Sequence, residues 1–275
     1  MAPQIGCNYS GPLMRLLAEG TVDVDWIKLA RQDTLAPDLA VARAVRPVLL
    51  HHLAPAGARP EVWEDFPWAL LSEQLAMAGS PHIALHLWIG PGDWDEPLDI
   101  RTQTGHQARA ILRRLVANIR RVRERIGLPV LIENVPYYGV RGSLRLTVEP
   151  EVLWQVAEEA GAGLLLDTSH LRCTAYNLGV DVHAYARALP LALVREMHVS
   201  GPRLVGSFLV DRHHALEDED YALIEWLLER TQPQIVTLEY GGTGEPMETP
   251  LRNDPVALQG QLVRLRRLTG AAETC

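Results

Sequence analysis

Residues 164–170 read Leu-Leu-Leu-Asp-Thr-Ser-His, a short apolar run that ends in a carboxylate and, three residues later, an imidazole. An uninterrupted apolar run of this length is typical of a central parallel strand, which is buried on both of its faces. Asp167 and His170 then fall at the carboxyl end of the strand, where α/β proteins place their functional groups. We therefore expect both side chains to belong to a functional site.

The same pattern recurs along the chain. Other strand-like runs end in histidine or a carboxylate: 48–50 before His51 and His52, 83–85 before His86, 130–132 before Glu133, 196–199 around His198, and 235–238 before Glu239. With 164–166, six strand-like runs end in this way. Because the carboxyl ends of parallel strands in a barrel meet at one mouth, we expect these side chains to form a single site.

Eight strand-like segments alternate with helix-like segments over the 275 residues. The expected strands are 4–8, 25–29, 47–52, 82–88, 129–135, 164–167, 194–199 and 235–240, and the expected helices are 13 onward, 37–45, 68–77, 103–126, 149–160, 181–189, 218–230 and 255–268. This alternation predicts an α/β protein with a parallel sheet, and eight units predict one (β/α)8 TIM-barrel domain over residues 1–275. A doubly wound open sheet is the alternative, but it would not bring six strand ends to one site.

Composition narrows the classes of function. The formal net charge of −8 disfavours a nucleic-acid partner, which would require clustered positive charge, and Lys28 is the only lysine. No signal peptide and no run of about 20 apolar residues is visible, so we expect no membrane association. Cys7, Cys173 and Cys275 are too few and too scattered for a disulfide framework or a thiolate zinc site. We expect a protein of the reducing cytoplasm.

A metal cluster is the simplest explanation of so many ionisable groups at one barrel mouth. The candidate metal ligands are His51, His86, Glu133, Asp167, His170, His198, Asp211, His213 and Glu239. Any one of them alone could be a hydrogen-bonded core residue or a solvated carboxylate. Together they would leave buried charge uncompensated, at a cost of several kcal/mol per group, unless cations were bound. Four carboxylates suit two or three divalent ions.

Spacing refines this set. Asp211 and His213 lie two residues apart, so on an extended segment they point the same way, whereas the adjacent His51 and His52 cannot both point inward. We expect ordinary structural roles for four further histidines: His82, His106, His183 and His214. Nitrogen and oxygen ligands without thiolate suit zinc, iron or manganese, and the sequence pattern does not choose among these metals.

The order of these residues resembles that of the endonuclease IV and xylose isomerase-like barrels: His, His, Glu, Asp-x-x-His, His, Asp-x-His, Glu. The flanking residues are similar to those of the multinuclear non-haem iron-dependent oxidases, the family of the methanobactin biosynthesis oxidase. The similar stretches are Glu133-Asn134-Val135, Leu165-Leu166-Asp167, Glu196-Met197-His198-Val199-Ser200-Gly201 and Val210-Asp211-Arg212-His213. Two departures stand out. His52 occupies a position where many relatives have glycine, which favours His51 as the ligand but keeps His52 as an alternative, and His170 stands where many relatives have asparagine.

This resemblance implies two or three iron ions, dioxygen as co-substrate, and modification of cysteine or another side chain of a ribosomally made precursor peptide. It also implies that a separate peptide-recognition protein can take part. We assign the catalytic role to Glu133, Asp167 and His198, with Glu133 bridging two metals and the chain's own cysteines as bystanders. The loop 88–99 and the Tyr137-Tyr138 loop are expected walls of the substrate site, although their aromatic side chains could simply cap the barrel.

Three other functions compete with the oxidase. A zinc- or manganese-dependent phosphodiester hydrolase of the endonuclease IV type is disfavoured by the acidic charge. A sugar isomerase or epimerase of the hydride-shift kind requires a lysine near the metals, and Lys28 lies early in the chain, in the second expected strand. A non-catalytic metal-binding or partner-binding protein would leave the open mouth and the excess of ligands without a purpose.

Overall fold

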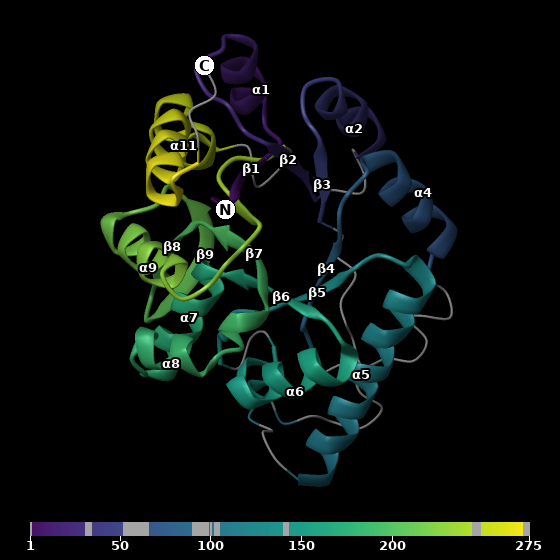
Figure 1. Cartoon of the computed structure of the whole chain (residues 1–275). Coiled ribbons are helices and arrows are strands. Elements are labelled where there is room, and N and C mark those ends of the chain that lie inside the picture. The colour runs from purple at the N-terminus through teal and green to yellow at the C-terminus, as the bar shows by residue number, and fades with distance from the viewer. Residues whose placement is uncertain are drawn as a thin grey trace.

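The computed structural model describes residues 2–30, 35–51, 66–89, 99, 101, 105–139, 143–243 and 249–271. Eight parallel strands curve into a nearly closed barrel with helices around its outside, which confirms the predicted fold class (Figure 1). The strands are β1 (Gln4–Asn8), β2 (Trp26–Leu29), β3 (Val48–Leu50), β4 (Ile83–His86), β5 (Val130–Glu133), β6 (Gly163–Asp167), β7 (Val194–Val199) and β10 (Ile235–Leu238). Their order in the sheet is β3-β2-β1-β10-β7-β6-β5-β4.

Strand alternation sorts the side chains into an outer and an inner layer. In β5, Val130 and Ile132 join the large apolar core, whereas Leu131 packs in a separate small cluster with Ala84 and Leu165. Because side chains two residues apart share a face, the inner cluster continues toward the mouth as the last residues of β4, β5 and β6. The same alternation that forms the barrel therefore places His86, Glu133 and Asp167 on its inside.

Between β3 and β4 the barrel has a seam. The hydrogen-bonded sheet ends at these two strands within the described residues. A buried serine joins them instead: the Ser80 hydroxyl accepts a hydrogen bond from the Leu50 amide (3.2 Å) and donates one to the His82 carbonyl (2.9 Å). Ser80 thus satisfies backbone groups that a strand ladder would otherwise pair.

The helices lie on the outer surface of the barrel (Figure 1). They are α1 (Gly11–Ala18), α2 (Leu35–Arg43), α4 (Trp68–Ala78), α5 (Gly105–Ile126), α6 (Pro150–Ala160), α7 (Thr168–Leu178), α8 (Val182–Ala188), α9 (Asp218–Leu228), α10 (Pro250–Asn253) and α11 (Pro255–Thr269). In α5, Ile111, Leu115 and Ile119 are fully buried at helical spacing. Gly127, with a φ of 72°, follows the helix in the left-handed conformation that commonly ends helices.

The sequence prediction missed two parts of the chain that carry candidate ligands. The segment around Asp211 is not a loop: after β7 the chain forms an antiparallel hairpin of β8 (Gly201–Val205) and β9 (Phe208–His214). Helix α7 was not predicted, because its polar Thr-Ser-His start follows directly on β6 without a turn signal. Asp167 itself starts this helix, since its side chain accepts a hydrogen bond from the His170 amide at 2.7 Å.

Candidate metal centre

The inner residues at the carboxyl ends of the strands converge as the sequence pattern indicated. Among the residues that the structure describes, three overlapping groups could each hold a metal ion, with their ligand atoms within 4.8 Å of one another. The groups are His51, His86 and Glu133; Glu133, Asp167 and His170; and Asp167, His198 and Glu239. Glu133 and Asp167 each belong to two groups, which is the arrangement expected where carboxylates are shared between ions.

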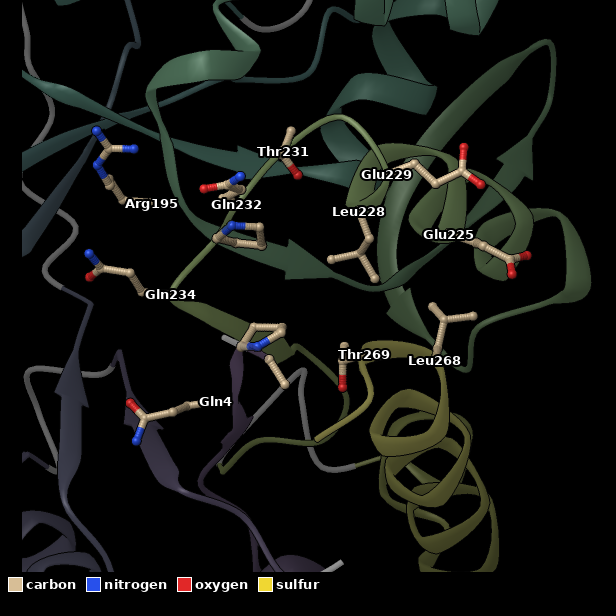
Figure 2. Close-up of a pocket in the computed structure, with 13 residues that line it drawn as sticks. Gln4, Arg195, Glu225, Leu228, Glu229, Thr231, Gln232, Gln234, Leu268 and Thr269 are labelled. Atoms are coloured by element: carbon tan, nitrogen blue, oxygen red, sulfur yellow. The ribbon is translucent and has the colours of Figure 1, made fainter. Parts of the chain in front are cut away.

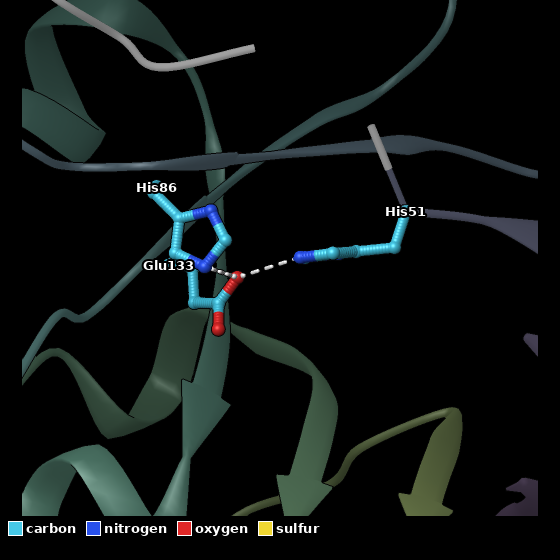
Figure 3. A group of neighbouring side chains, drawn as sticks. All are labelled: His51, His86 and Glu133. Carbon is cyan, nitrogen blue, oxygen red and sulfur yellow. Dashed lines mark ion pairs between the residues drawn. The ribbon is translucent and has the colours of Figure 1, made fainter. Parts of the chain in front are cut away.

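Glu133 stands between two pairs of imidazoles. Its Oε2 atom lies 3.4 Å from His51 Nε2 and 3.3 Å from His86 Nε2, and Figure 3 shows both rings pointing at this one oxygen. Its Oε1 atom lies 3.5 Å from His170 Nδ1 and 3.8 Å from His198 Nδ1. The two oxygens thus face different histidine pairs, and the carboxylate is 1% exposed.

Asn134 positions Asp167 and His170 through hydrogen bonds. Its side chain donates to the Asp167 carbonyl at 3.0 Å and accepts from the Asp167 amide at 2.8 Å. The Asn134 carbonyl lies 2.8 Å from Nδ1 of His170 and accepts a hydrogen bond from it, so the ring's Nε2 is left toward Asp211 Oδ2 at 3.7 Å. Asp167 and His170 are therefore positioned by a helix start and by the residue that follows Glu133.

Asp211 and His213 reach the site from the hairpin. Oδ2 of Asp211 lies 2.7 Å from His213 Nε2, and the same nitrogen lies 3.6 Å from Glu239 Oε2. His213 has a φ of 50°, a conformation that costs a non-glycine residue about 1–3 kcal/mol. Asn177 of α7 fixes the hairpin, because its side chain pairs with both the amide and the carbonyl of Leu209 at 2.9 Å.

Gly201, the first residue of β8, lies where the chain passes close to its own backbone at Ala215. A Cβ atom at Gly201 would lie 2.3 Å from the carbonyl oxygen of Ala215, closer than any side chain tolerates. Gly201 therefore lets the chain turn back against itself directly after β7, and this turn returns Asp211 and His213 to the mouth.

A buried polar chain below the mouth was missed by sequence reasoning. Glu196, 2% exposed, contacts His198 Nε2 through Oε1 (3.2 Å) and His82 Nε2 through Oε2 (2.6 Å). The Thr237 hydroxyl donates to Glu196 Oε1 at 2.7 Å. Glu196 stands two residues before His198 on β7, so strand periodicity was the available signal. His82, for which we expected an ordinary structural role, is buried and hydrogen-bonded to Glu196.

Lys28 also belongs to this region. The sequence analysis counted its early position in the chain against a sugar isomerase, and the structure corrects that argument. The Lys28 ammonium forms an ion pair with Glu239, and the lysine is 3% exposed. Its early position in the chain therefore does not distance it from the candidate ligands, since β2 lies beside β1 and β1 beside β10. A lysine therefore does lie near the candidate ligands, so the position of Lys28 is not an argument against an isomerase.

The buried charges shift one another's pKa values. Burial lowers the pKa of His86 to about 3 and that of His198 to about 4, and the neighbouring Lys28 acts in the same direction. Burial raises the pKa of Glu133 well above its usual range. For His170 burial alone would lower the pKa, but Asp167, Asp211 and Glu133 outweigh it and raise the pKa to about 10. Groups with lowered pKa values and groups with raised pKa values thus lie together at this mouth, as they commonly do at functional sites.

Unsatisfied atoms test whether the residues suit a bound metal. Within the described residues, Glu133 Oε2, Asp167 Oδ2, His198 Nδ1 and His213 Nδ1 are buried and lack a hydrogen-bond partner. Buried polar atoms are nearly always paired, so several orphans in one cluster indicate a missing partner. Three of the four belong to the groups that could hold an ion, and the nitrogen and oxygen donors suit Zn, Fe or Mn.

The remaining participants named in the sequence analysis are His52, the loop 88–99, the Tyr137-Tyr138 loop and the cysteines. His52 and most of the loop 88–99 lie outside the described residues, as does Cys275. Cys7 and Cys173 are buried and free, and burial raises the pKa of both thiols, so they stay protonated near neutral pH. Tyr138 lies against the site, since its hydroxyl accepts a hydrogen bond from the Asp211 amide at 3.1 Å.

A separate cavity of about 1160 Å³ opens at the opposite end of the barrel. Gln4, Arg195 and Gln234 line it near the starts of β1, β7 and β10, together with the ends of α9 and α11 (Figure 2). It lacks the convergent imidazoles and carboxylates of the mouth. Because chemistry in these barrels takes place at the carboxyl end of the strands, we assign the site to the mouth.

Comparison with known proteins agrees with this geometry. Residues 106–253 match the family described as RiPP precursor modification enzyme MbnB/TglH/ChrH, where RiPP denotes a ribosomally made, modified peptide. An Anaeromyxobacter protein, UPF0276 protein Anae109_1558, is 31% identical over 198 residues, covering 69% of this chain and 68% of its own. The chain belongs to the MbnB/TglH/ChrH family.

Other members differ in how much of their length aligns. A Chromobacterium violaceum UPF0276 protein is 26% identical over 98% of this chain and 95% of its own length, whereas the chain spans half the length of a Bordetella pertussis relative at 35% identity. The matched segment 106–253 contains Glu133, Asp167, His198, Asp211 and His213. The family to which the chain belongs is thus one of RiPP precursor modification enzymes, and the matched segment contains these candidate ligands.

Solved structures agree on the fold. The IOLI protein with a binding zinc atom superposes with a TM-score of 0.63 at 15% identity, over 99% of this chain and 100% of its own. D-psicose 3-epimerase superposes with a TM-score of 0.58, also at 15% identity, over 98% of this chain and all of its own. These likenesses establish the TIM-barrel fold. Within the described residues, no helix has the length and apolarity to span a membrane.

Proposed function

We propose that the protein is a multinuclear iron-dependent oxidase that uses dioxygen to modify cysteine, or another side chain, of a ribosomally made precursor peptide. The observation that carries the proposal is the position of Glu133, whose two oxygens face two different histidine pairs. Membership in a family of RiPP-modifying enzymes supports the peptide substrate. Two or three ions suit the overlapping ligand groups.

Iron held by imidazole and carboxylate ligands supplies dioxygen activation and an open position for a substrate thiolate. In the proposal Glu133 would bridge two ions, Asp167 would be shared by two ligand groups, and His198 would supply Nδ1. The remaining ligands are His51, His86, His170, Asp211, His213 and Glu239. The protein's own residues orient these groups: Glu196 fixes the His198 ring, and Asn134 fixes Asp167 and His170.

The peptide enters at the mouth in this proposal. Tyr138, which contacts the backbone of Asp211, forms one wall of the entrance. The reactive sulfur arrives on the peptide, because the pKa values of the buried thiols of Cys7 and Cys173 are raised by burial and neither is exposed. A separate peptide-recognition protein and a location in the cytoplasm are parts of the proposal that rest on the resemblance and the composition.

Metal content and peptide turnover test the proposal together. Protein purified without oxygen from iron-rich medium is analysed for metals, then incubated in air with a cysteine-containing peptide encoded beside its gene, with any partner protein encoded there. We expect stoichiometric iron, oxygen uptake and a changed peptide mass. Zinc as the sole metal, an unchanged peptide and metal-dependent cleavage of an abasic-site oligonucleotide would instead establish the hydrolase of the endonuclease IV type.

A further inference from the structure

The longest helix of the described chain, α5, has an uneven charge. Its 22 residues include seven arginines and one glutamate. It therefore contributes +6 to a chain whose formal net charge is −8, and the remaining residues together carry −14. Six of the seven arginines are exposed, whereas Ile111, Leu115 and Ile119 are buried against the barrel. The outer face of α5 is thus a basic strip on an otherwise acidic protein.

Two arginines near the end of α5 have structural roles. Arg120 Nε donates to the Glu159 carbonyl, and Arg123 donates to the Ala160 carbonyl, both at 2.9 Å. These carbonyls belong to the last turn of α6, where a helix leaves backbone acceptors without intrahelical partners. The contacts join α5 to α6, so the fold itself explains these two residues.

Arg109 and Arg113 have no such role. Among the residues that the structure describes, neither side chain has a hydrogen-bond, ion-pair or aromatic partner. Arginines on other elements do pair with carboxylates, as Arg46 does with Asp23 at 2.6 Å. Arg109 and Arg113 are one helical turn apart, so they leave α5 on the same side with their Cβ atoms about 6 Å apart. Two exposed guanidinium groups therefore stand together with no structural contact to explain them.

The two residues lie on the mouth side of the barrel. Only residues 127–129 separate the end of α5 from the start of β5, so this end of the helix lies at the amino ends of the strands. Arg113 and Arg109 lie about 20 Å and about 25 Å back along the helix, whereas a strand of four or five residues spans only about 13–17 Å. Because α5 runs along the outside of the barrel (Figure 1), both arginines reach the level of the mouth.

We propose that Arg109 and Arg113 bind an acidic segment of the peptide substrate while the residue to be modified lies in the mouth. The inference rests on the proposed function only in that the substrate is a peptide. Alternate side chains of an extended peptide point the same way about 6.6 Å apart, which is close to the spacing of the two arginines. Each guanidinium group can hold one carboxylate through two parallel N–H donors. Two acidic residues separated by one residue are thus paired at once.

Other anionic partners fit this strip less well. Helix α6, beside α5, carries three exposed acidic residues: Glu151, Glu158 and Glu159. A long nucleic acid or an anionic membrane surface extends beyond one helix and would meet these carboxylates. The apolar face of α5 is buried in the barrel, so it cannot insert into a membrane. A short acidic segment can remain on the basic strip.

Two labelled peptides test the proposal. Both carry fluorescein, one cysteine and a flexible glycine-serine linker, followed in one by a run of about six glutamates and in the other by the same number of glutamines. Binding to zinc-loaded protein is measured by fluorescence anisotropy. We expect the glutamate peptide to bind more tightly, with an advantage that decreases as salt is added. In the double variant Arg109→Gln/Arg113→Gln its Kd should rise about 5–30-fold, and that of the glutamine peptide should not change.

The double variant Arg15→Gln/Arg267→Gln is the matched control, because it removes the same charge from exposed positions on α1 and α11. It should bind the glutamate peptide like wild type, and circular dichroism checks that both variants are folded. Equal affinity of wild type for the two peptides, equal weakening in both variants, or tighter binding of a long duplex DNA would overturn the proposal. Zinc-loaded protein is used without turnover, so failure of the oxidase function leaves this result unaffected.

Discussion

His198 Nε2 lies 3.2 Å from Glu196 Oε1, and Nδ1 of the same ring lies 3.2 Å from Glu239 Oε1. One imidazole thus joins a carboxylate inside the barrel to a carboxylate at its mouth. A histidine that donates one ring N–H to a buried carboxylate presents its other nitrogen as a metal ligand in a fixed direction. Glu196 is itself held by His82 and Thr237, so the direction is set deep in the barrel.

Replacing Glu196 by Gln tests this support. We expect metal affinity to fall about 10–100-fold. Glutamine keeps the shape of Glu196, but its NH2 group cannot accept a hydrogen bond, so only one of His198 and His82 can still donate to this side chain. Competition with a chromogenic chelator measures the affinity, and the exposed Glu225→Gln is the matched control. Wild-type affinity in Glu196→Gln would show that the His198 ring is held without its carboxylate.

Glu133→Gln tests the bridge. The substitution removes the negative charge that stands between His51 and His86 on one side and His170 and His198 on the other. We expect at least one metal equivalent to be lost, together with activity, as measured by elemental analysis of the purified variant. The exposed Glu151→Gln should retain its metals. Full metal content and activity in Glu133→Gln would disprove a bridging role.

Metal binding should release protons at pH 7. In the metal-free protein His170 has a pKa of about 10 and Glu133 a pKa well above its usual range, so both hold protons that a metal must displace. Apparent affinity should therefore rise with pH, and the release from His170 should vanish above about pH 10. Calorimetry in two buffers of different ionisation enthalpy counts the protons. His170→Asn should release one fewer, and an equal count would contradict the prediction.

The same pKa shift of His170 affects stability. Its folded-state pKa lies above the ordinary value of 6.5, so its contribution to the stability of the metal-free fold is fully present below about pH 6.5 and is lost as pH rises through about 10. Urea unfolding of metal-free wild type and His170→Asn is measured between pH 6 and 10. The difference between the two free energies of unfolding should become smaller toward high pH. A difference that widened would contradict the sign.

Asn177→Ala should affect only the hairpin-borne ligands. Asn177 pairs with both backbone groups of Leu209 and with the Tyr137 carbonyl, and this holds β9 against α7. Without it β9 loses this contact with α7, so Asp211 and His213 should be held less firmly, while His51, His86 and Glu133 keep their contacts. We expect the metal content to fall by about one ion in elemental analysis, with the barrel still folded by circular dichroism. Unchanged stoichiometry would show that the hairpin is held by other contacts.

Ser80→Ala should destabilise the barrel at its seam. The substitution leaves the buried Leu50 amide and His82 carbonyl without the partner that joins β3 to β4. We expect a loss of about 1–3 kcal/mol in the free energy of unfolding, measured by urea denaturation. Ser207→Ala, at the exposed turn of the β8–β9 hairpin, should change it by less than about 0.5 kcal/mol. Equal losses of stability in the two variants would show that Ser80 does not stabilise the junction of β3 and β4.

The barrel and most of the candidate site could be predicted from the sequence. Apolar runs ended by His86, Glu133 and Asp167 mark both the strands and their functional ends, because period-two alternation and strand termination are local properties. The order of ligands along the chain carried the family, which the match over residues 106–253 bears out. The metal that the ligands select remains a prediction.

The remaining contacts depend on how the strands are arranged in the folded barrel. That Lys28 meets Glu239, and that Glu196 joins His82 to His198, depends on which strands become neighbours when the sheet curls. Helix α7 and the β8–β9 hairpin escaped prediction because the partners that stabilise them, Asp167 at the helix start and Asn177 beside Leu209, act across contacts that no local pattern encodes. Side chains far apart in sequence acquire their partners, and hence their chemistry, only when the barrel brings its strand ends together.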